Sequence, residues 1–222
     1  MMPFPGGIEE TANGTLILSA VAALVYGLIV NIKPMPLRTA VKMLAVGALA
    51  VLTFLEQEPA LLFGALVLSA CADGFLSREG DRMFLAGLAS MLAAHLFYVA
   101  LFLNEGAGLG RLLAETWRIA LAAAIVLAAP VMLALLWRRL KPALRLPIFL
   151  YVLAIVTMSL SALTLDRAWV VLGALLFLAS DALLATEKFI ISAISPHRAW
   201  LRHLVWALYY VAQLTITLSF LL

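Results

Sequence analysis

Eight apolar stretches, each about as long as a bilayer is thick, constrain this chain more than any other feature. A membrane-spanning helix needs roughly 20 mostly apolar residues, because the hydrocarbon layer is about 30 Å thick and each helical residue rises about 1.5 Å. We expect such helices, separated by short polar or Pro/Gly-containing turns, over 14–32, 37–55, 59–78, 82–103, 115–137, 146–164, 169–190 and 200–221. The sequence therefore predicts an all-α integral membrane bundle of eight transmembrane helices, with 1–222 forming a single transmembrane domain.

Composition also favours a membrane fold. Of the 222 residues, 65% are hydrophobic and 12% are charged, whereas soluble domains average about 45–50% apolar and about 25% charged residues. A soluble core cannot hide so much apolar surface.

The basic residues indicate how the helices are oriented. Only three basic residues lie on the side of the bundle that holds the turns after the second, fourth and sixth expected helices, namely Arg111, Arg118 and Arg167. Eleven lie in or beside the turns after the first, third, fifth and seventh expected helices, namely Lys33, Arg38, Arg78, Arg82, Arg138, Arg139, Lys141, Arg145, Lys188, Arg198 and Arg202. The positive-inside rule then predicts a multi-pass protein of the cell membrane with these turns in the cytoplasm and both termini outside. Topology and anionic membrane lipid explain such turns, so nucleic acid is not an expected partner.

The two halves of the chain resemble each other weakly at an offset of 109 residues. Residues 64–66 (Gly-Ala-Leu) align with 173–175, and Lys42 aligns with Tyr151. Segments rich in Ala and Leu align easily, so both a chance match and a duplication stay open. A duplication would give two parallel four-helix repeats with a site between them. The repeat halves would be 14–103 and 115–221.

Four ionisable residues fall inside the expected helices: Lys42, Asp73, His95 and Asp181. A charge within hydrocarbon costs about 2.5–3.5 kcal/mol on insertion scales, so such residues are functional candidates. Counted at about 1.5 Å per residue from the basic turns, Lys42 and the two aspartates lie about 6–10 Å deep, and His95 lies deeper. We therefore expect one cavity that these side chains share.

Other polar residues are spaced to face the same interior. His95 and Tyr98 are three residues apart on one expected helix, and Tyr209 and Gln213 are four apart on another, which places each pair on one helical face. Tyr151 falls in the layer of the aspartates.

Each of these residues also has an ordinary structural explanation. Lys42 lies close enough to the boundary to snorkel toward water. Asp73 and Asp181 can be structural partners of Lys42 or of hydroxyl groups. His95 can be a hydrogen-bonded packing residue, and tyrosines in membrane helices are commonly interface or core residues.

Several enzyme classes lack their sequence signatures here. The chain has no His-Glu-x-x-His pair and no Gly-x-Ser-x-Gly turn, so we expect no metal, no cofactor and no serine nucleophile. Two carboxyl groups in a dry cavity can divide into one acid and one base, because the group nearer a cation stays ionised while the other stays protonated. Such a pair suits acid-catalysed hydrolysis.

At these residues the sequence resembles the lysoplasmalogenase family of multi-pass membrane proteins, the YhhN-like group. The ordered motifs that carry the resemblance are Lys42, Ser69-Ala70-Cys71-Ala72-Asp73, Phe84-x-x-Gly87, His95-x-x-Tyr98, Tyr151, Gly173-x-x-x-Phe177-x-x-Ser180-Asp181 and Tyr209-Tyr210-x-x-Gln213. One departure is Ala72, where family members often have Gly.

The resemblance implies hydrolysis of the vinyl ether bond of lysoplasmalogens, which releases a fatty aldehyde and glycerophosphoethanolamine or glycerophosphocholine. Asp73 and Asp181 would be the catalytic pair: one protonates the β-carbon of the enol ether, and the other stabilises the oxocarbenium ion and activates water. Which aspartate has which role stays open. Lys42 would hold the substrate phosphate. The remaining substrate-binding residues would be His95, Tyr98, Tyr151, Ser180, Tyr209, Tyr210 and Gln213.

Two other function classes stay open. The same charges can form a proton or substrate relay in a small transporter, and a non-catalytic lipid-binding scaffold can use the same bundle. An intramembrane aspartyl protease also uses two membrane aspartates, but the surroundings of Asp73 and Asp181 do not resemble that family's motifs.

Overall fold

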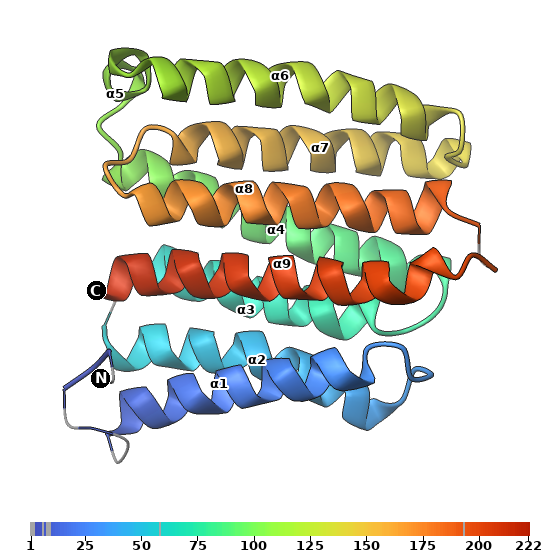
Figure 1. Cartoon of the computed structure of the whole chain (residues 1–222), viewed down its shortest axis with the longest axis horizontal. Helices are drawn as coiled ribbons and strands as arrows, with labels where there is room; N and C mark the ends of the chain where they lie inside the picture. Colours follow the sequence, from blue (N-terminus) through green and yellow to red (C-terminus); the bar gives the residue numbers. More distant parts are fainter. Residues whose placement is uncertain (1–2, 6, 8–9, 58, 193) are drawn as a thin grey trace.

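The fold is a bundle of helices that run side by side along one axis (Figure 1). The computed structural model describes residues 3–5, 7, 10–57, 59–192 and 194–222. Within these residues the chain forms helices and turns but no strand. The helices are α1 (Thr11–Ile29), α2 (Pro36–Leu55), α3 (Ala60–Leu76), α4 (Asp81–Glu105), α5 (Leu109–Ala114), α6 (Thr116–Trp137), α7 (Pro142–Ala162), α8 (Ala168–Ala185), the π-helix η1 (Thr186–Ile190) and α9 (His197–Leu221).

Seven segments of the described chain are long and apolar enough to cross a membrane. They are α1, α2, α4, α6, α7, α9 and the continuous stretch Ala168–Ile190. The protein is therefore a multi-pass membrane protein. The third predicted helix, 59–78, corresponds to α3, which is also apolar but has only 17 residues and packs against α2 and α4.

The helix boundaries differ most from those expected in α1, α7 and α9, the last of which begins at His197 rather than at 200. Helix α1 begins and ends three residues before the predicted 14–32. Helix α7 begins at Pro142 rather than at 146, because proline is tolerated at the first helical position, where its missing N–H is not needed. The short α5 was not expected, since six residues give too little periodicity to recognise.

Corresponding helices pack alike in the two halves of the chain. The contacts α1·α2, α2·α3 and α3·α4 recur as α6·α7, α7·α8 and α8·α9. Between the halves, the fourth helix of each half packs against the second helix of the other half: α4 packs against α7, and α9 packs against α2. This arrangement favours the predicted parallel repeat, which stays a prediction.

Small residues let the central helices approach closely. A Cβ atom on Gly173 of α8 would lie 2.6 Å from Ile216 of α9, and one on Gly64 of α3 would lie 2.5 Å from the Phe97 ring of α4. Glycine at these contacts is the usual way to bring membrane helices together. The resulting core fixes the positions of the polar side chains between the helices.

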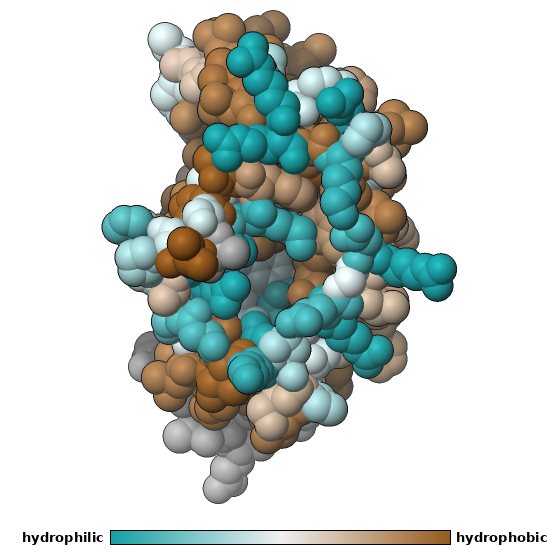
Figure 2. All heavy atoms as spheres, turned by 90° about the vertical axis from the view of Figure 1, so that its right-hand side faces the viewer, coloured by the Kyte–Doolittle hydropathy of each residue, from teal (hydrophilic) through white to brown (hydrophobic). Residues whose placement is uncertain are grey.

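The two ends of the bundle differ in charge. Most of the Lys and Arg residues lie in or beside the turns α1–α2, α3–α4, α6–α7 and α8–α9, and we call this the basic end. Both termini lie at the opposite end (Figure 1). Figure 2 looks onto the basic end and shows hydrophilic side chains around a hollow.

Arg118, at the opposite end, has a structural role. Its side chain is only 3% exposed and donates hydrogen bonds to the main-chain oxygens of Leu163 and Leu165, at 2.6 and 2.8 Å. Its Nε also donates to Glu115 at 2.9 Å. Arg118 thereby satisfies carbonyl groups that the end of α7 leaves without helical partners.

Candidate active site

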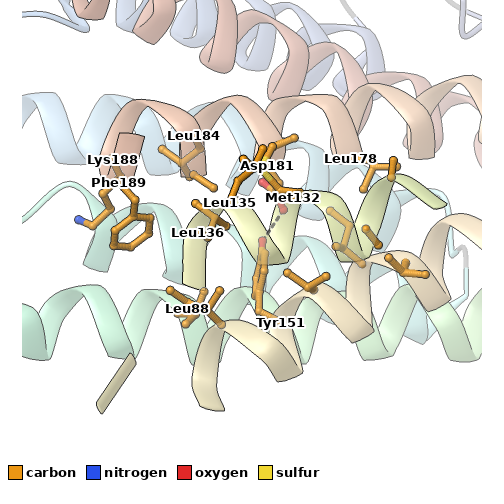
Figure 3. Close-up of a pocket in the computed structure, with 18 of the residues that line it drawn as sticks. Leu88, Met132, Leu135, Leu136, Tyr151, Leu178, Asp181, Leu184, Lys188 and Phe189 are labelled. Carbon is orange, nitrogen blue, oxygen red and sulfur yellow. Dashed lines mark hydrogen bonds between the residues drawn. The ribbon is translucent and has the colours of Figure 1, made fainter. Parts of the chain in front are cut away.

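Two cavities meet inside the bundle. The first, which we call the vestibule, has a volume of about 540 Å³, opens at the basic end and is lined by charged groups such as Lys42, Asp73 and Glu187. The second, which we call the groove, has a volume of about 530 Å³ and lies between α6 and helices α4, α7 and α8 (Figure 3). Six residues line both cavities, namely Leu76, Phe84, Met91, Asp181, Leu184 and Lys188. Asp181 is the one acidic residue among them, so its carboxyl group marks the junction.

Asp73 is held by a cation and a phenol. Lys42 Nζ of α2 lies 2.8 Å from Asp73 Oδ1, and the Tyr209 hydroxyl of α9 donates to Oδ2 at 2.9 Å. The same ammonium group lies 5.6 and 5.7 Å from the ring centroids of Tyr26 and Trp206. Lys42 therefore points into the bundle toward Asp73 instead of snorkelling to the boundary.

Asp181 has a different set of partners. The Tyr151 hydroxyl of α7 donates a hydrogen bond to Asp181 Oδ2 (Figure 3). His95 Nε2 of α4 lies 3.8 Å from the same oxygen, too far for a direct hydrogen bond. Among the described residues, no Lys or Arg side chain lies within ion-pair distance of Asp181.

The hydrogen bonds of His95 fix its tautomer. His95 Nδ1 lies 2.7 Å from the main-chain oxygen of Met91. Because a carbonyl oxygen only accepts hydrogen bonds, Nδ1 carries the proton, and Nε2 of the neutral ring is an acceptor. This buried Nε2 has no hydrogen-bond partner in the described part of the protein. The ring is fixed edge-on against Phe177 and Tyr151, with centroids 4.9 and 5.2 Å away.

The two aspartate sites have matching geometry but different chemistry. Each aspartate lies on the third helix of its half, with one partner from the second helix of that half and another from the fourth helix of the opposite half. Lys42 and Tyr151, which align at the offset of 109, take equivalent places beside Asp73 and Asp181. At this second-helix position the first carboxyl group thus faces an ammonium group, and the second faces a phenol.

Not every predicted site residue lies in these cavities. The expectation of one shared cavity fails for His95, which is fully buried and lines neither cavity. The Tyr98 hydroxyl donates to Gln213 Oε1, and both of these residues are also fully buried outside the lining of either cavity. The Ser180 side chain lines the vestibule, but its hydroxyl group donates to a main-chain oxygen of α9 at 2.9 Å. The Tyr210 hydroxyl lies 2.9 Å from Ser19 Oγ on α1, away from both aspartates.

The sequence did not single out the rim of the vestibule. Glu187 is 6% exposed, and its carboxylate accepts hydrogen bonds from Arg198 at 2.6 Å and Arg202 at 3.2 Å. Lys188, the next residue, lines both cavities. The sequence did contain one signal for this rim, a glutamate within an otherwise basic turn. It was not used, because the positive-inside rule already explained the basic residues of the turn.

Comparison with known proteins confirms the resemblance that the motifs suggested. The chain is 31% identical over 178 residues to proteins named lysoplasmalogenase from Mycobacterium tuberculosis and Mycobacterium bovis, a match that covers 78% of this chain and 65% of each relative. It is 34% identical over 161 residues to lysoplasmalogenase TMEM86B of Rattus norvegicus, which covers 72% of this chain and 60% of that protein. The matched region thus spans less than two thirds of each relative.

No solved structure matches the chain. The family model described as YhhN matches residues 37–220, which include both aspartates and all of their partners. The chain belongs to the YhhN family.

Proposed function

We propose that this protein is a lysoplasmalogenase, a membrane-embedded hydrolase that cleaves the vinyl ether bond of a lysoplasmalogen. The observation that carries the proposal is the position of Asp181, where the apolar groove meets the polar vestibule. A lysoplasmalogen is divided in the same way: an apolar alkenyl chain joins a polar glycerophospho head group at the vinyl ether. With the chain in the groove and the head group in the vestibule, the scissile bond lies beside Asp181.

The lining of the groove suits the alkenyl chain. Leu88, Met132 and Leu135 are among the apolar side chains that surround it in Figure 3. On α6, Leu127 and Val131 are 69% and 61% exposed, so this helix presents much of its surface to lipid. We propose that the substrate enters the groove from the bilayer past α6, which has few buried residues.

We also propose that the chain crosses the membrane eight times, with α3 as the eighth crossing. Both termini lie at the end opposite the basic turns, which requires an even number of crossings (Figure 1). The positive-inside rule then places the basic end in the cytoplasm, so that the vestibule opens toward the inner leaflet.

The partners of the two aspartates indicate which one donates the proton and which one supplies the negative charge that stabilises the cation, here called the counter-charge. Lys42 lies 2.8 Å from Asp73 and holds that carboxylate in its ionised form. Asp181 lacks a cation within ion-pair distance in the described chain and borders an apolar groove, where a neutral carboxylic acid is the less costly form. Asp181 is therefore the proton donor, and the Asp73 carboxylate supplies negative charge to the same cavity.

The reaction then consumes one water molecule and restores the proton of the Asp181 carboxyl group. Asp181 transfers its proton to the β-carbon of the enol ether, which leaves an oxocarbenium ion at the ether carbon. The Asp181 and Asp73 carboxylates stabilise this cation. Water adds to the ether carbon and returns a proton to Asp181, and the hemiacetal collapses to a fatty aldehyde and the free glycerol hydroxyl group.

His95 is placed to hold the water. Its Nε2 accepts hydrogen bonds and faces Asp181 Oδ2 across 3.8 Å. Because His95 lines neither cavity, we propose that a water molecule enters between the two atoms when substrate binds and donates to both. A water molecule oriented in this way presents its oxygen to the oxocarbenium carbon. His95 is therefore a water-positioning residue.

A His95→Phe substitution should lower kcat about 100-fold and leave KM within about threefold, because the ring packing persists while the acceptor for water is lost. Steady-state aldehyde release by the purified variant measures both constants. Ser159→Ala is the matched control, since it removes a buried hydroxyl that bonds only within its own helix at 2.8 Å. An unchanged kcat in a folded His95→Phe protein would rule out the water-positioning role.

The function itself is tested with the purified protein in detergent. We expect it to release aldehyde from 1-alkenyl-2-hydroxy-glycerophosphoethanolamine and to leave the 1-alkyl and 1-acyl analogues intact, because only an enol ether forms an oxocarbenium ion on carbon protonation. The alternative, a transporter, needs a sealed compartment and consumes nothing. Uptake of the lipid into proteoliposomes without any aldehyde would support the transporter and contradict the hydrolase.

A further inference from the structure

Lys188 is a basic residue at the junction of the two cavities. It lies in η1, and its Nζ is 4.0 Å from the centroid of the Phe84 ring of α4. Both residues line the groove as well as the vestibule, and Figure 3 shows Lys188 beside the groove. In the described residues no carboxylate lies within ion-pair distance of this ammonium group. The preceding Glu187 instead pairs with Arg198 and Arg202 of α9.

The π-helical turn accounts for this separation of neighbouring charges. Such turns insert extra backbone into a helix and are frequent at functional sites. Here η1 continues α8 for five residues and places Glu187 against α9 while Lys188 and Phe189 line the groove. The turn therefore leaves Lys188 available to a ligand on the groove side.

Four of the six other basic residues that line the vestibule are already engaged, and the remaining two, Lys33 and Arg78, do not line the groove. Lys42 is paired with Asp73, so the phosphate role that the resemblance gave it competes with this ion pair. Arg198 and Arg202 share Glu187, and Arg38 donates to the Tyr26 hydroxyl at 3.2 Å. Lys188 is also the only basic residue among the described ones that lines the groove.

The spacing from Asp181 to Lys188 fits a glycerophospholipid. Lys188 lies seven positions after Asp181, beyond the junction of α8 with η1, which puts it about 10 Å nearer the basic end along the helix axis. In a lysoplasmalogen, six bonds join the vinyl ether carbon to the phosphorus atom, about 7 Å when extended. An ammonium group contacts a phosphate oxygen at about 3 Å, so the substrate and this contact together span a length of the same order as the helical spacing.

We propose that Lys188 is the binding residue for the phosphate of the lysolipid head group, and that this contact places the vinyl ether at Asp181. The proposal rests on the proposed function and makes it more specific: the substrate must carry an anionic phosphodiester at a fixed distance from its enol ether. The Phe84 ring holds the ammonium group at the rim until the phosphate replaces this weaker cation–π contact.

The test compares two vinyl ether substrates that differ in phosphate. One is 1-alkenyl-glycerophosphoethanolamine, and the other is 1-alkenylglycerol, which has the same reactive bond and no phosphate. We expect Lys188→Met to raise KM for the first substrate about 10- to 100-fold, the effect of losing a hydrogen bond to a charged group, and to leave KM for the second unchanged. Lys188→Arg, which keeps the charge, should stay within about threefold of the unmodified protein.

A matched control and a competition arm complete the test. Lys141→Met removes an exposed lysine of the same end that pairs with Asp81 at 2.8 Å, and it should change neither KM. A 1-acyl lysophosphatidylethanolamine should compete with the substrate, about 10-fold less well after Lys188→Met, whereas millimolar inorganic phosphate should not compete. Equal competition by inorganic phosphate would indicate a general anion site and overturn the assignment to a lipid head group.

The outcomes distinguish a failure of this inference from a failure of the proposed function. If the unmodified protein releases no aldehyde from either substrate, the proposed function fails. If it releases aldehyde but Lys188→Met changes KM for both substrates alike, or for neither, then Lys188 does not bind the phosphate.

Discussion

An Asp181→Asn protein is expected to bind lysoplasmalogen with near-normal affinity and to release almost no aldehyde. Asparagine matches aspartate in shape and accepts the Tyr151 hydrogen bond through its amide oxygen, but it has no acidic proton for the enol ether carbon. A positioned acid contributes about 10²- to 10⁴-fold, and the same group here also takes a proton from water, so we expect kcat to fall about 1,000-fold or more.

The matched control for Asp181 is Asp166→Asn at the opposite end. Asp166 is exposed and bonds to Arg111, far along the bundle from both cavities. Its substitution should leave kcat within about twofold. Binding is followed separately, as the shift in melting temperature on addition of an uncleavable alkyl ether lysolipid. An Asp181→Asn protein that keeps more than a tenth of normal kcat would show that this carboxyl group is not the acid.

The second large effect concerns the Lys42 and Asp73 ion pair. Asp73→Asn leaves a lysine ammonium group inside the bundle without its counter-charge, so we expect it to cost about 3–5 kcal/mol of unfolding free energy and most of the activity. Lys42→Met alone should also destabilise the protein. The double variant removes both charges and should recover most of the lost stability, because no unpaired charge remains.

A double-mutant cycle on unfolding in detergent measures this coupling, and aldehyde release measures the function. The stability changes should be strongly non-additive, whereas activity should stay low in the double variant, because the Asp73 carboxylate that stabilises the oxocarbenium ion is missing. Additive stability changes would show that the ion pair is not coupled. Recovery of activity along with stability would reduce Asp73 to a structural residue.

The sequence predicted the helices well because each one must satisfy its own backbone hydrogen bonds in lipid and must therefore be long and apolar. It also placed Lys42, Asp73 and Asp181 in one layer, since depth follows from counting residues along a helix. The boundary at Pro142 and the six-residue α5 escaped prediction, because local capping and short turns leave little trace in an apolar pattern.

Rotational position was harder to predict than depth. Tyr209 and Tyr210 are adjacent in sequence, but successive helical residues differ by about 100° in direction. Tyr209 therefore reaches Asp73, while Tyr210 reaches Ser19 of α1. Lys188 could not be recognised either, because its position depends on a π-helical turn and on the pairing of Glu187 with α9. Neither feature follows from an average helical repeat.

The matching aspartate sites give a physical account of how one bundle obtains two carboxyl groups with different roles. Each site draws on the same three helix positions, and the main chemical difference is Lys42 in one and Tyr151 in the other. An ammonium group favours the ionised form of its aspartate more strongly than the hydrogen bond of a phenol does. In the proposed mechanism this difference, together with Tyr209 beside Asp73 and His95 beside Asp181, makes one aspartate the counter-charge and the other the acid.

The most direct test of carbon protonation at Asp181 is the reaction in D₂O followed by mass spectrometry of the aldehyde. Because the solvent-exchanged carboxyl group delivers the proton to the β-carbon, the account predicts one deuterium on the carbon next to the carbonyl group. It also predicts an intact glycerophospho product, and no labelled aldehyde from the Asp181→Asn protein. Aldehyde that lacks deuterium at that carbon, or labelled aldehyde formed at the normal rate without Asp181, would contradict it.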